Sequence, residues 1–539
     1  MGGAEPRLLL WGAGSRHPAR REPLIRPRPL PLDGAVVPGL LLLLARDLLL
    51  YDPPRVLAWR LSHDPRLLAA AAWLGPLLPT PTGALDRDPV ALLLAALAAL
   101  LALGAIGART MGPEGTWLAP LLLGTMFKFS WQAQFGQIDM LVTALVVSQV
   151  ALGLRLASGE GSRLAGVLGM VALGTAGILA KGPVACLLPW IILLAYLAAG
   201  RNFGGLKRLG LPWIALGTVA LCSLWLGAAA WLQGADYVRG LVLRQSVQRY
   251  LEPWHHKAPA YYYLGIFFSD GLPYSLLVVP LAWLVAKSRR WREPAALLSM
   301  TWILTYLVFF SASAGKRSVY ILPLFPAMAL LVAFGLRAIS REGWPRRGVA
   351  GAWLVLTVIL AVGLVAVVLV LPPAYVSLRP WIISGLAVLT IAGLGAWRLA
   401  LSGRPIASAV AVAAGAVLFM FTTAVPVSLR LDHIKSPREL GARIRSEVPP
   451  GGSVGIFPDL VPSVNYYADS TTTVFPEQAS SDALRFLLER PGRLLLVQES
   501  EWSLGMPRGT RFLGVYTLGD HRFMLLGGPP EPSRHGATD

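Results

Sequence analysis

The chain has 539 residues, of which 55% are hydrophobic and 14% charged, and its mean hydropathy is +0.58. Soluble domains are typically about one quarter charged, so this composition excludes an ordinary soluble globular protein. The formal net charge of +19 does not indicate a nucleic-acid partner. No basic patch interleaved with aromatic residues occurs in a polar region, and many of the cations lie in short loops between apolar segments.

Residues 1–89 form an atypical N-terminal region in which Pro and Arg are dense and charges interrupt the apolar runs. A first span is a candidate at 34–51, although Arg46 and Asp47 make its insertion costly. A disordered, proline-rich cytoplasmic tail is one interpretation. The other is that the region is partly out of frame or truncated, and an acidic pair followed by a Pro-Pro motif in another reading frame is the expected sign.

From Val90 to Val427, apolar segments long enough to cross a bilayer follow one another. A span needs roughly 20 mostly apolar residues. The predicted fold class is therefore an all-α polytopic membrane protein with about 12–13 transmembrane helices, twelve of them within 90–427. The expected spans are 90–108, 116–134, 139–156, 164–180, 183–199, 211–232, 260–286, 294–312, 319–336, 349–371, 381–397 and 406–427.

The loops between these spans alternate between two chemistries. Short loops rich in Lys and Arg stay in the cytoplasm. The remaining loops hold nearly every polar side chain that could take part in binding or catalysis. We therefore expect an active site on the outer face. The basic loops contain Arg155 and Arg163; Arg201, Lys207 and Arg208; Lys287, Arg289, Arg290 and Arg292; Arg337, Arg341, Arg346 and Arg347; and Arg398 and Arg404.

Residues 428–539 have the character of a small soluble α/β domain, which the loop alternation places outside the cytoplasm. Ser436-Pro437-Arg438-Glu439 has the pattern of a capped helix start. A strand is expected at 453–457, a helix at about 481–490, a strand at 493–498, and a strand pair near 511–517 and 521–526.

Asp139 begins a span directly after the polar run Gln132, Gln134 and Gln137. It can be a helix N-terminal charge that the helix dipole satisfies. The functional interpretation is that Asp139 faces an outer cavity and binds a sugar hydroxyl, a metal or an acceptor amine.

Two outer loops carry cations against the positive-inside tendency. Arg244 and Arg249 lie in one, and Lys316 and Arg317 lie in a very short second one. Guanidinium and ammonium groups suit a diphosphate or a lipid-linked phosphate. The alternatives are an amphipathic surface helix for the first loop and snorkelling anchors for the second.

The first of these loops continues into Trp254, His255 and His256. Trp254 can stack on a sugar face, and the two histidines are weak candidates for a divalent metal, because adjacent histidines without a third ligand are a poor signal. No cofactor is firmly predicted. Lys181-Gly182-Pro183 has no phosphate-loop pattern and is interpreted as a tight structural turn.

Taken in order, four blocks resemble the lipid-linked-sugar glycosyltransferases of the GT-C membrane class, which include protein O-mannosyltransferases and lipid A aminoarabinose transferases. The blocks are Gln137-Ile138-Asp139-Met140; Lys181-Gly182-Pro183; Arg249-Tyr250-Leu251 with His255-His256, Pro259 and Tyr261-Tyr262; and Phe309-Phe310-Ser311 with Lys316-Arg317, Tyr320 and Pro323. The resemblance covers roughly residues 90–530.

This resemblance implies a bacterial inner membrane enzyme that uses a polyprenyl-phosphate sugar as donor and a lipid, glycan or protein as acceptor. Sugar transfer from such a donor requires an acid that orients or deprotonates the acceptor and cations that stabilise the leaving phosphate. Asp139 is our candidate for the catalytic residue, and the candidates for donor-phosphate ligands are Arg244, Arg249, Lys316 and Arg317. Sugar or acceptor contacts are then expected from Trp254, His255, His256, Tyr261, Tyr262 and Tyr320.

The sequence departs from this family in its first outer loop. The family has an Asp-Glu pair there, followed by Lys/Arg-Pro-Pro-x-Tyr. In this sequence, Asp52-Pro53-Pro54-Arg55 has some of these residue types but in a different order. A multi-pass transporter of a lipid or sugar, or a catalytically impaired structural relative, are therefore the alternative functions. A transporter would predict internal repeats and charged or broken spans near the membrane centre, and no convincing repeat occurs.

Overall fold

The structure is a computed structural model that describes residues 88–529. Its gaps are 135–136, 235–237, 240–257, 314, 343–345, 372, 436, 449–452, 459–463, 465–471, 477–478, 503, 506–508 and 519–520. The candidate first span at 34–51, the stretch Asp52–Arg55 and the residues from Arg244 to Lys257 therefore lie outside the described residues.

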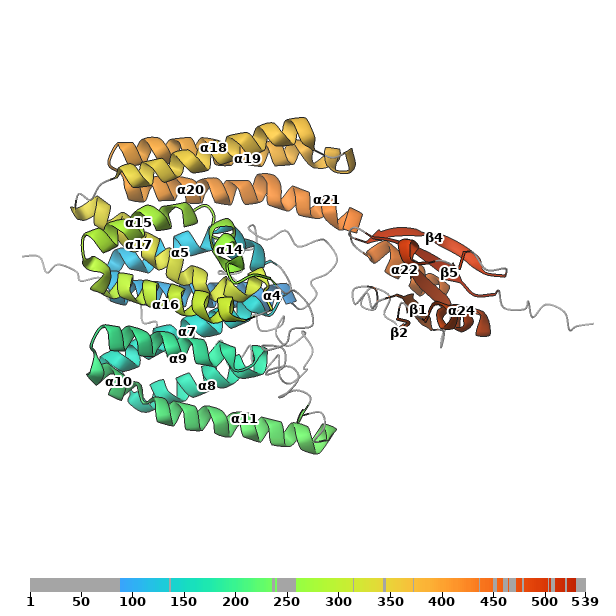
Figure 1. The fold of residues 1–539 in the computed structure, drawn as a ribbon, viewed down its shortest axis with the longest axis horizontal. Coiled ribbons are helices and arrows are strands. Elements are labelled where there is room, and N and C mark those ends of the chain that lie inside the picture. Colours follow the sequence, from blue (N-terminus) through green and yellow to red (C-terminus); the bar gives the residue numbers. More distant parts are fainter. Residues whose placement is uncertain are drawn as a thin grey trace, which may run out of the picture.

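Helices make up almost all of the described chain up to Lys435 (Figure 1). Within the described part, nine helical segments are long and apolar enough to cross a membrane, or ten if one bent pair counts as a span. The predicted polytopic helical fold is confirmed. The long helices are α4 (Asp88–Met111), α7 (Asp139–Ser158), α8 (Arg163–Lys181), α11 (Leu211–Gln233), α16 (Pro294–Ala312), α17 (Phe325–Glu342), α18 (Arg347–Val370), α19 (Arg379–Leu401) and α20 (Pro405–Phe419).

Three expected spans differ from the prediction of continuous helices. The segment at 116–134 is divided into α5 (Pro113–Gly124) and α6 (Phe127–Gln132). The segment at 260–286 is divided into α14 (Tyr262–Asp270) and α15 (Ser275–Lys287), which meet at a bend of 106°. The segment at 183–199 forms α9 (Val184–Ala199), which at 16 residues is shorter than a full span.

The break between α14 and α15 has a local cause in the sequence. Between α14 and α15, Gly271 lowers helix stability and Pro273 has no N–H to donate. Apolar composition over a whole segment conceals these interruptions.

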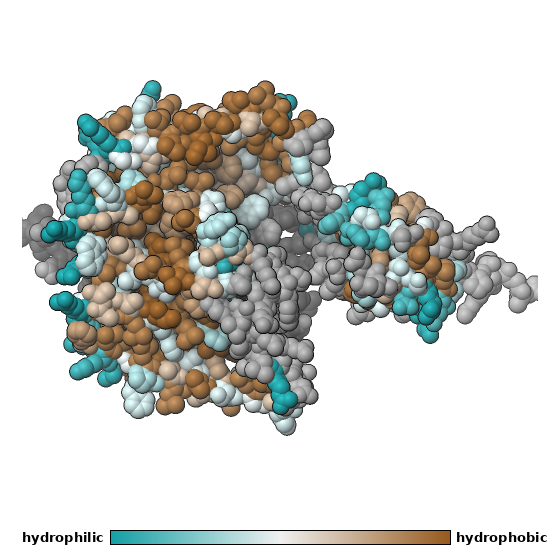
Figure 2. All heavy atoms as spheres, viewed as in Figure 1, coloured by the Kyte–Doolittle hydropathy of each residue, from teal (hydrophilic) through white to brown (hydrophobic). Residues whose placement is uncertain are grey.

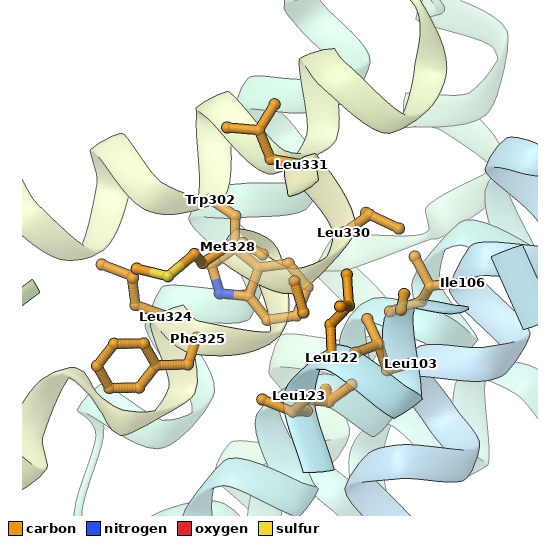
Figure 3. Close-up of a cluster of buried hydrophobic side chains, with 14 of the residues drawn as sticks. Leu103, Ile106, Leu122, Leu123, Trp302, Leu324, Phe325, Met328, Leu330 and Leu331 are labelled. Carbon is orange, nitrogen blue, oxygen red and sulfur yellow. The ribbon is translucent and has the colours of Figure 1, made fainter. Parts of the chain in front are cut away.

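The centre of the helical body is α17 together with the preceding 3₁₀ segment η4 (Ser318–Leu324), which are almost wholly buried. By contrast, α11, α18, α19 and α20 lie at the periphery and expose apolar side chains, as lipid-facing helices do. Figure 3 shows part of the core, where α4 and α5 pack against α16 and α17. The residues labelled there are Leu103, Ile106, Leu122, Leu123, Trp302, Leu324, Phe325, Met328, Leu330 and Leu331.

The loops that were predicted to lie inside gather at one end of the helical body. Arg109 forms an ion pair with Glu160 at 2.8 Å, and Glu114 pairs with Arg341 at 2.7 Å and with Arg337 at 3.1 Å. These pairs join the connection between α4 and α5 to two of the predicted inner loops. Figure 2 shows hydrophilic residues collected at this end, opposite the C-terminal sheet.

The C-terminal part is a five-stranded sheet in the order β2-β1-β3-β5-β4, which follows α21 (Val425–Lys435). β1 is parallel to β2 and β3, whereas β5 is antiparallel to β3 and β4. β3 is buried on both faces, and α22 (Arg438–Glu447) and α24 (Ser480–Glu489) cover opposite faces. The strands are β1 (Val454–Phe457), β2 (Thr472–Val474), β3 (Leu494–Gln498), β4 (Arg511–Leu518) and β5 (His521–Gly527).

These strands and helices match the small α/β domain that the sequence predicts, with one correction. The short edge strand β2 was not predicted, because three residues are too few for a periodic signal. The helix expected after Ser436 is present as α22, which begins at Arg438. The capping box itself stays a prediction, because Ser436 lies outside the described residues.

Candidate active site

The two broken spans meet each other at the end of the helical body opposite the basic loops. The backbone N–H of Phe127 donates to the carbonyl of Leu272 at 2.9 Å. The hydroxyls of Thr125 and Tyr274 lie 2.7 Å apart. Backbone groups freed by a helix break within a membrane need hydrogen-bonding partners inside the protein. Here each break supplies hydrogen-bonding partners to the other.

Beside this junction lies a pocket of about 320 Å³. Three of its lining residues carry positive charge, and the described lining contains no carboxylate. The pocket is therefore suited to an anionic ligand, because phosphate and carboxylate oxygens accept charge-assisted hydrogen bonds from Lys and Arg. It is lined by Lys128, Trp131, Gln132, Gln137, Tyr262, Lys316, Arg317, Ser318 and Val319.

Lys128 of α6 reaches from the junction into this pocket. Its Nζ forms an ion pair with Asp270 at 3.3 Å and donates to the hydroxyl of Ser318 at 3.1 Å. Asp270 ends α14 at the helix break, and Ser318 begins η4. One side chain therefore connects three elements that are far apart in the sequence.

Lys316 and Arg317 are adjacent in the sequence but have different surroundings. Lys316 is only 4% exposed as a whole residue, and its ammonium donates to the carbonyls of Ser311, at 3.2 Å, and Ser313 at the end of α16. The Arg317 guanidinium is exposed and makes no hydrogen bond or ion pair with any described residue. Its backbone N–H donates to the hydroxyl of Tyr263 at 3.2 Å. The snorkelling interpretation is thus wrong for Lys316, which is buried, and Arg317 is the more available cation.

Asp139 lies next to this pocket in a second polar cluster. It opens α7, is 8% exposed, and forms an ion pair with Lys181 at the end of α8. The Lys181 ammonium also lies over the ring of Tyr320, 4.9 Å from its centroid. Gln137, which lines the pocket, accepts a hydrogen bond from Gln132 at 2.9 Å just before Asp139. The two clusters are joined through Arg317, whose carbonyl accepts the N–H of Tyr320 at 3.0 Å.

The structure thus brings together Asp139, Lys316, Arg317, Tyr262 and Tyr320 from three separate segments. Tyr261 is 74% exposed and does not line the pocket. The other predicted site residues, Arg244, Arg249, Trp254, His255 and His256, lie outside the described residues. Their assigned roles remain predictions.

Sequence reasoning missed Lys128, Asp270 and the side-chain role of Lys181. Lys128 and Asp270 lie within segments that look like continuous apolar spans, where an isolated charge is itself a functional signal. The turn at Gly182, which has φ 86°, is confirmed as a helix end. Lys181 nevertheless does more than precede a turn, because it is the partner of Asp139.

A metal centre is not formed by the residues that the structure describes, among which no group of three or more His, Cys, Asp or Glu side chains could hold an ion. The two histidines proposed as weak ligands, His255 and His256, are not among those residues. The question of a divalent metal therefore stays a prediction of the sequence.

Known proteins with similar sequences are undecaprenyl phosphate-α-4-amino-4-deoxy-L-arabinose arabinosyl transferases. The chain is 32% identical over 195 residues to the enzyme of Aeromonas hydrophila, which covers 36% of this chain and 35% of that one. It is 32% identical over 291 residues to one from Pseudomonas fluorescens, covering 51% and 52%. The chain thus spans between about a third and a half of the length of these relatives. No family model matches it.

The similarity of the fold extends further than that of the sequence. ArnT from Cupriavidus metallidurans, in the apo state, superposes with a TM-score of 0.65 at 20% identity, covering 81% of this chain and 83% of that one. The structure of ArnT bound to undecaprenyl phosphate gives a TM-score of 0.64.

The chain has the fold of these transferases. The resemblance of the chain to the GT-C lipid A aminoarabinose transferases is confirmed by the sequence and fold comparisons together. With this fold and its many apolar helices, the chain is an integral membrane protein.

Proposed function

We propose that this chain is a glycosyltransferase that moves a sugar from a polyprenyl-phosphate donor to a lipid, glycan or protein acceptor on the outer face of a membrane. The observation that carries this proposal is the pocket beside Arg317, which combines three cations with an absence of carboxylates among its described lining residues. Such a lining selects an anion, and a phosphate bound there lies within the membrane-edge region that a lipid-linked donor can reach.

In the proposed reaction, an acceptor oxygen or amine attacks the anomeric carbon of the sugar. The bond between that carbon and the phosphate oxygen breaks, its electron pair stays with the phosphate, and the acceptor loses a proton. The leaving phosphate gains negative charge as the bond breaks. Cations already in place, Arg317 first among them, therefore stabilise the transition state more than the ground state.

Asp139 is proposed to orient or deprotonate the acceptor. A general base must lie close to the proton that it removes, and Asp139 lies in the cluster adjoining the pocket. Its ion pair with Lys181 fixes the direction of the carboxylate. Tyr320, which contacts Lys181, and Tyr262, which lines the pocket, are positioned to contact the sugar or the acceptor.

The names of the relatives suggest the donor, an undecaprenyl-phosphate-linked 4-amino-4-deoxy-L-arabinose. The same fold is known with undecaprenyl phosphate bound, in ArnT. Lipid A is the acceptor that the family resemblance favours. We propose these as donor and acceptor for this chain, within a bacterial inner membrane.

The orientation proposed for the chain follows from charge. The ion-paired loops of Arg109, Glu160 and Arg341 lie at one end and the candidate pocket at the other. If the basic end faces the cytoplasm, the pocket and the C-terminal sheet face outward. That side is where a donor delivered across the membrane would be used.

The test is turnover of a radiolabelled undecaprenyl-phosphate-aminoarabinose in proteoliposomes that contain the full chain and lipid A. Label transferred to lipid A supports the proposal. Movement of the donor across the bilayer without transfer would instead identify a transporter, and neither result would identify a catalytically impaired relative. A parallel assay with a chelator, followed by divalent metal, tests the predicted metal dependence.

A further inference from the structure

We infer that Lys128 is a further donor-positioning residue, whose ammonium group contacts the phosphate of the lipid-linked donor while Asp270 and Ser318 hold it in place. This inference rests on the proposed function, because it requires a phosphate-bearing donor in the pocket beside Arg317. It adds a residue that lies outside all four sequence blocks.

The ammonium group of Lys128 has an N–H donor left for a ligand. An ammonium group has three N–H donors. One is directed to the hydroxyl of Ser318 at 3.1 Å, and the carboxylate of Asp270 lies 3.3 Å away. The side chain is 13% exposed, and the surface that it exposes lines the pocket.

The contact with Asp270 does not use all of the hydrogen-bonding capacity of either side chain. Asp270 Oδ2 is buried and has no partner that meets hydrogen-bond geometry among the described residues, although Nζ of Lys128 lies within ion-pairing distance. Asp270 therefore supplies compensating charge and fixes the position of the ammonium without saturating it. A phosphate oxygen in the pocket can take the remaining donor.

The start of α6, which carries Lys128, is held by hydrogen bonds to the second interrupted span. α6 begins at Phe127, whose N–H is bonded to Leu272, and the preceding Thr125 is bonded to Tyr274. Lys128 thus stands on the junction of two interrupted helices. In membrane proteins, discontinuous helices typically surround the substrate site, because irregular backbone is tolerated where it is buried or lines a cavity.

The competing explanation is that Lys128 only neutralises Asp270. The two explanations separate in a double variant, because a buried ion pair can be replaced by apolar groups of similar size without loss of stability. We compare Lys128→Met, Asp270→Leu and the double variant Lys128→Met/Asp270→Leu in the full chain. Lys287→Met, an exposed lysine at the basic end, is the matched control.

Two properties are measured for each purified variant: thermal stability, and affinity for undecaprenyl phosphate in detergent micelles. Both single variants should be less stable, and the double variant should recover most of that loss. Its affinity for undecaprenyl phosphate should nevertheless stay roughly 10- to 100-fold weaker than that of the wild type, since one charge-assisted contact is missing. Lys128→Arg should retain much of the affinity.

A double variant that binds undecaprenyl phosphate as tightly as the wild type would overturn the inference and leave the proposed function intact. A wild-type chain that binds undecaprenyl phosphate through Lys128 but transfers no sugar would contradict the proposed function alone. Absence of any binding by the wild type would overturn the inference about Lys128.

Discussion

At the scale of single residues, three lysines near the candidate site have three different environments. Lys128 lies between Asp270 and Ser318, Lys181 pairs with Asp139, and Lys316 caps the carbonyl end of α16. A lysine is a compact charge with three rotatable donors on a flexible stem, so the sequence context of one lysine says little about its partner. Only the tertiary structure shows which partner each lysine has.

The pair of Asp139 and Lys181 gives the first prediction. Asp139→Asn and Lys181→Met should each destabilise the protein, because each leaves one charge of a partly buried ion pair without its partner. The double variant Asp139→Leu/Lys181→Met should regain stability. If Asp139 acts on the acceptor, turnover of the double variant stays at least about 100-fold below wild type. Recovery of both stability and turnover would show that the pair is only structural.

Arg317 gives the second prediction at this scale. Arg317→Ala should lower turnover by roughly 30- to 1000-fold, corresponding to about 2–4 kcal/mol of lost transition-state stabilisation. Arg244→Ala should act in the same direction if that residue reaches the donor. Stability should be unchanged for Arg317→Ala, since its guanidinium is exposed.

The control for these arginines is Arg398→Ala, which removes an exposed guanidinium near the end of α19. Its turnover should match the wild type. If both Arg317→Ala and Arg244→Ala had wild-type turnover, the prediction that these arginines bind the donor phosphate would be wrong.

At the scale of elements, α4 and α5 cross at a pair of glycines. A Cβ atom added to Gly107 would lie 2.1 Å from the backbone oxygen of Gly115, and one added to Gly115 would lie 2.2 Å from that of Gly107. Small residues allow such close approach of helices in membranes. The crossing matters for the site because α5 leads directly into the break and then α6.

The third prediction tests this crossing. Gly107→Ala should lower stability by about 1–3 kcal/mol, because the two backbones must separate to admit a methyl group. Gly363→Ala in α18 is the matched control, since nothing lies within 4 Å of the added Cβ there. Its stability should be unchanged or slightly higher, because Ala favours a helix over Gly. The measurement is thermal unfolding of both variants in the same detergent, and equal stabilities would contradict the close crossing.

At the scale of the whole molecule, the helical body has one end rich in ion-paired arginines and another end that holds the pocket and the sheet (Figures 1 and 2). A membrane protein with this polarity has two possible orientations. The excess of Lys and Arg in short loops favours the one in which the basic end is cytoplasmic.

The fourth prediction tests this orientation with an impermeant thiol reagent on intact cells. Cys186 and Cys222 are first replaced by Ala, and a single cysteine is introduced as Ser500→Cys in the sheet domain or Ser288→Cys at the basic end. Both serines are exposed. Ser500→Cys should be labelled from outside and Ser288→Cys only after permeabilisation. The opposite pattern would reverse the proposed orientation.

The sequence alone determined the features that depend on composition and short-range pattern. The positions of the apolar helices follow from segment hydropathy, and the alternation of basic loops anticipated which loops share an end of the molecule. In the C-terminal part, the unbroken apolar run of β3 and the amphipathic α24 predicted an α/β sheet. The short blocks around Asp139, Lys316 and Arg317 were enough to indicate the family resemblance and part of the site.

The tertiary structure alone decided which charges meet. Residues separated by 42 positions, as in Asp139 and Lys181, or by more than 140, as in Lys128 and Asp270, become partners only when the helices pack. The breaks near Thr125 and Gly271 were hidden because an average over 20 apolar residues barely registers one turn of lost helix. Each break is stable because the other one supplies its hydrogen-bonding partners, and that compensation exists only in the folded protein.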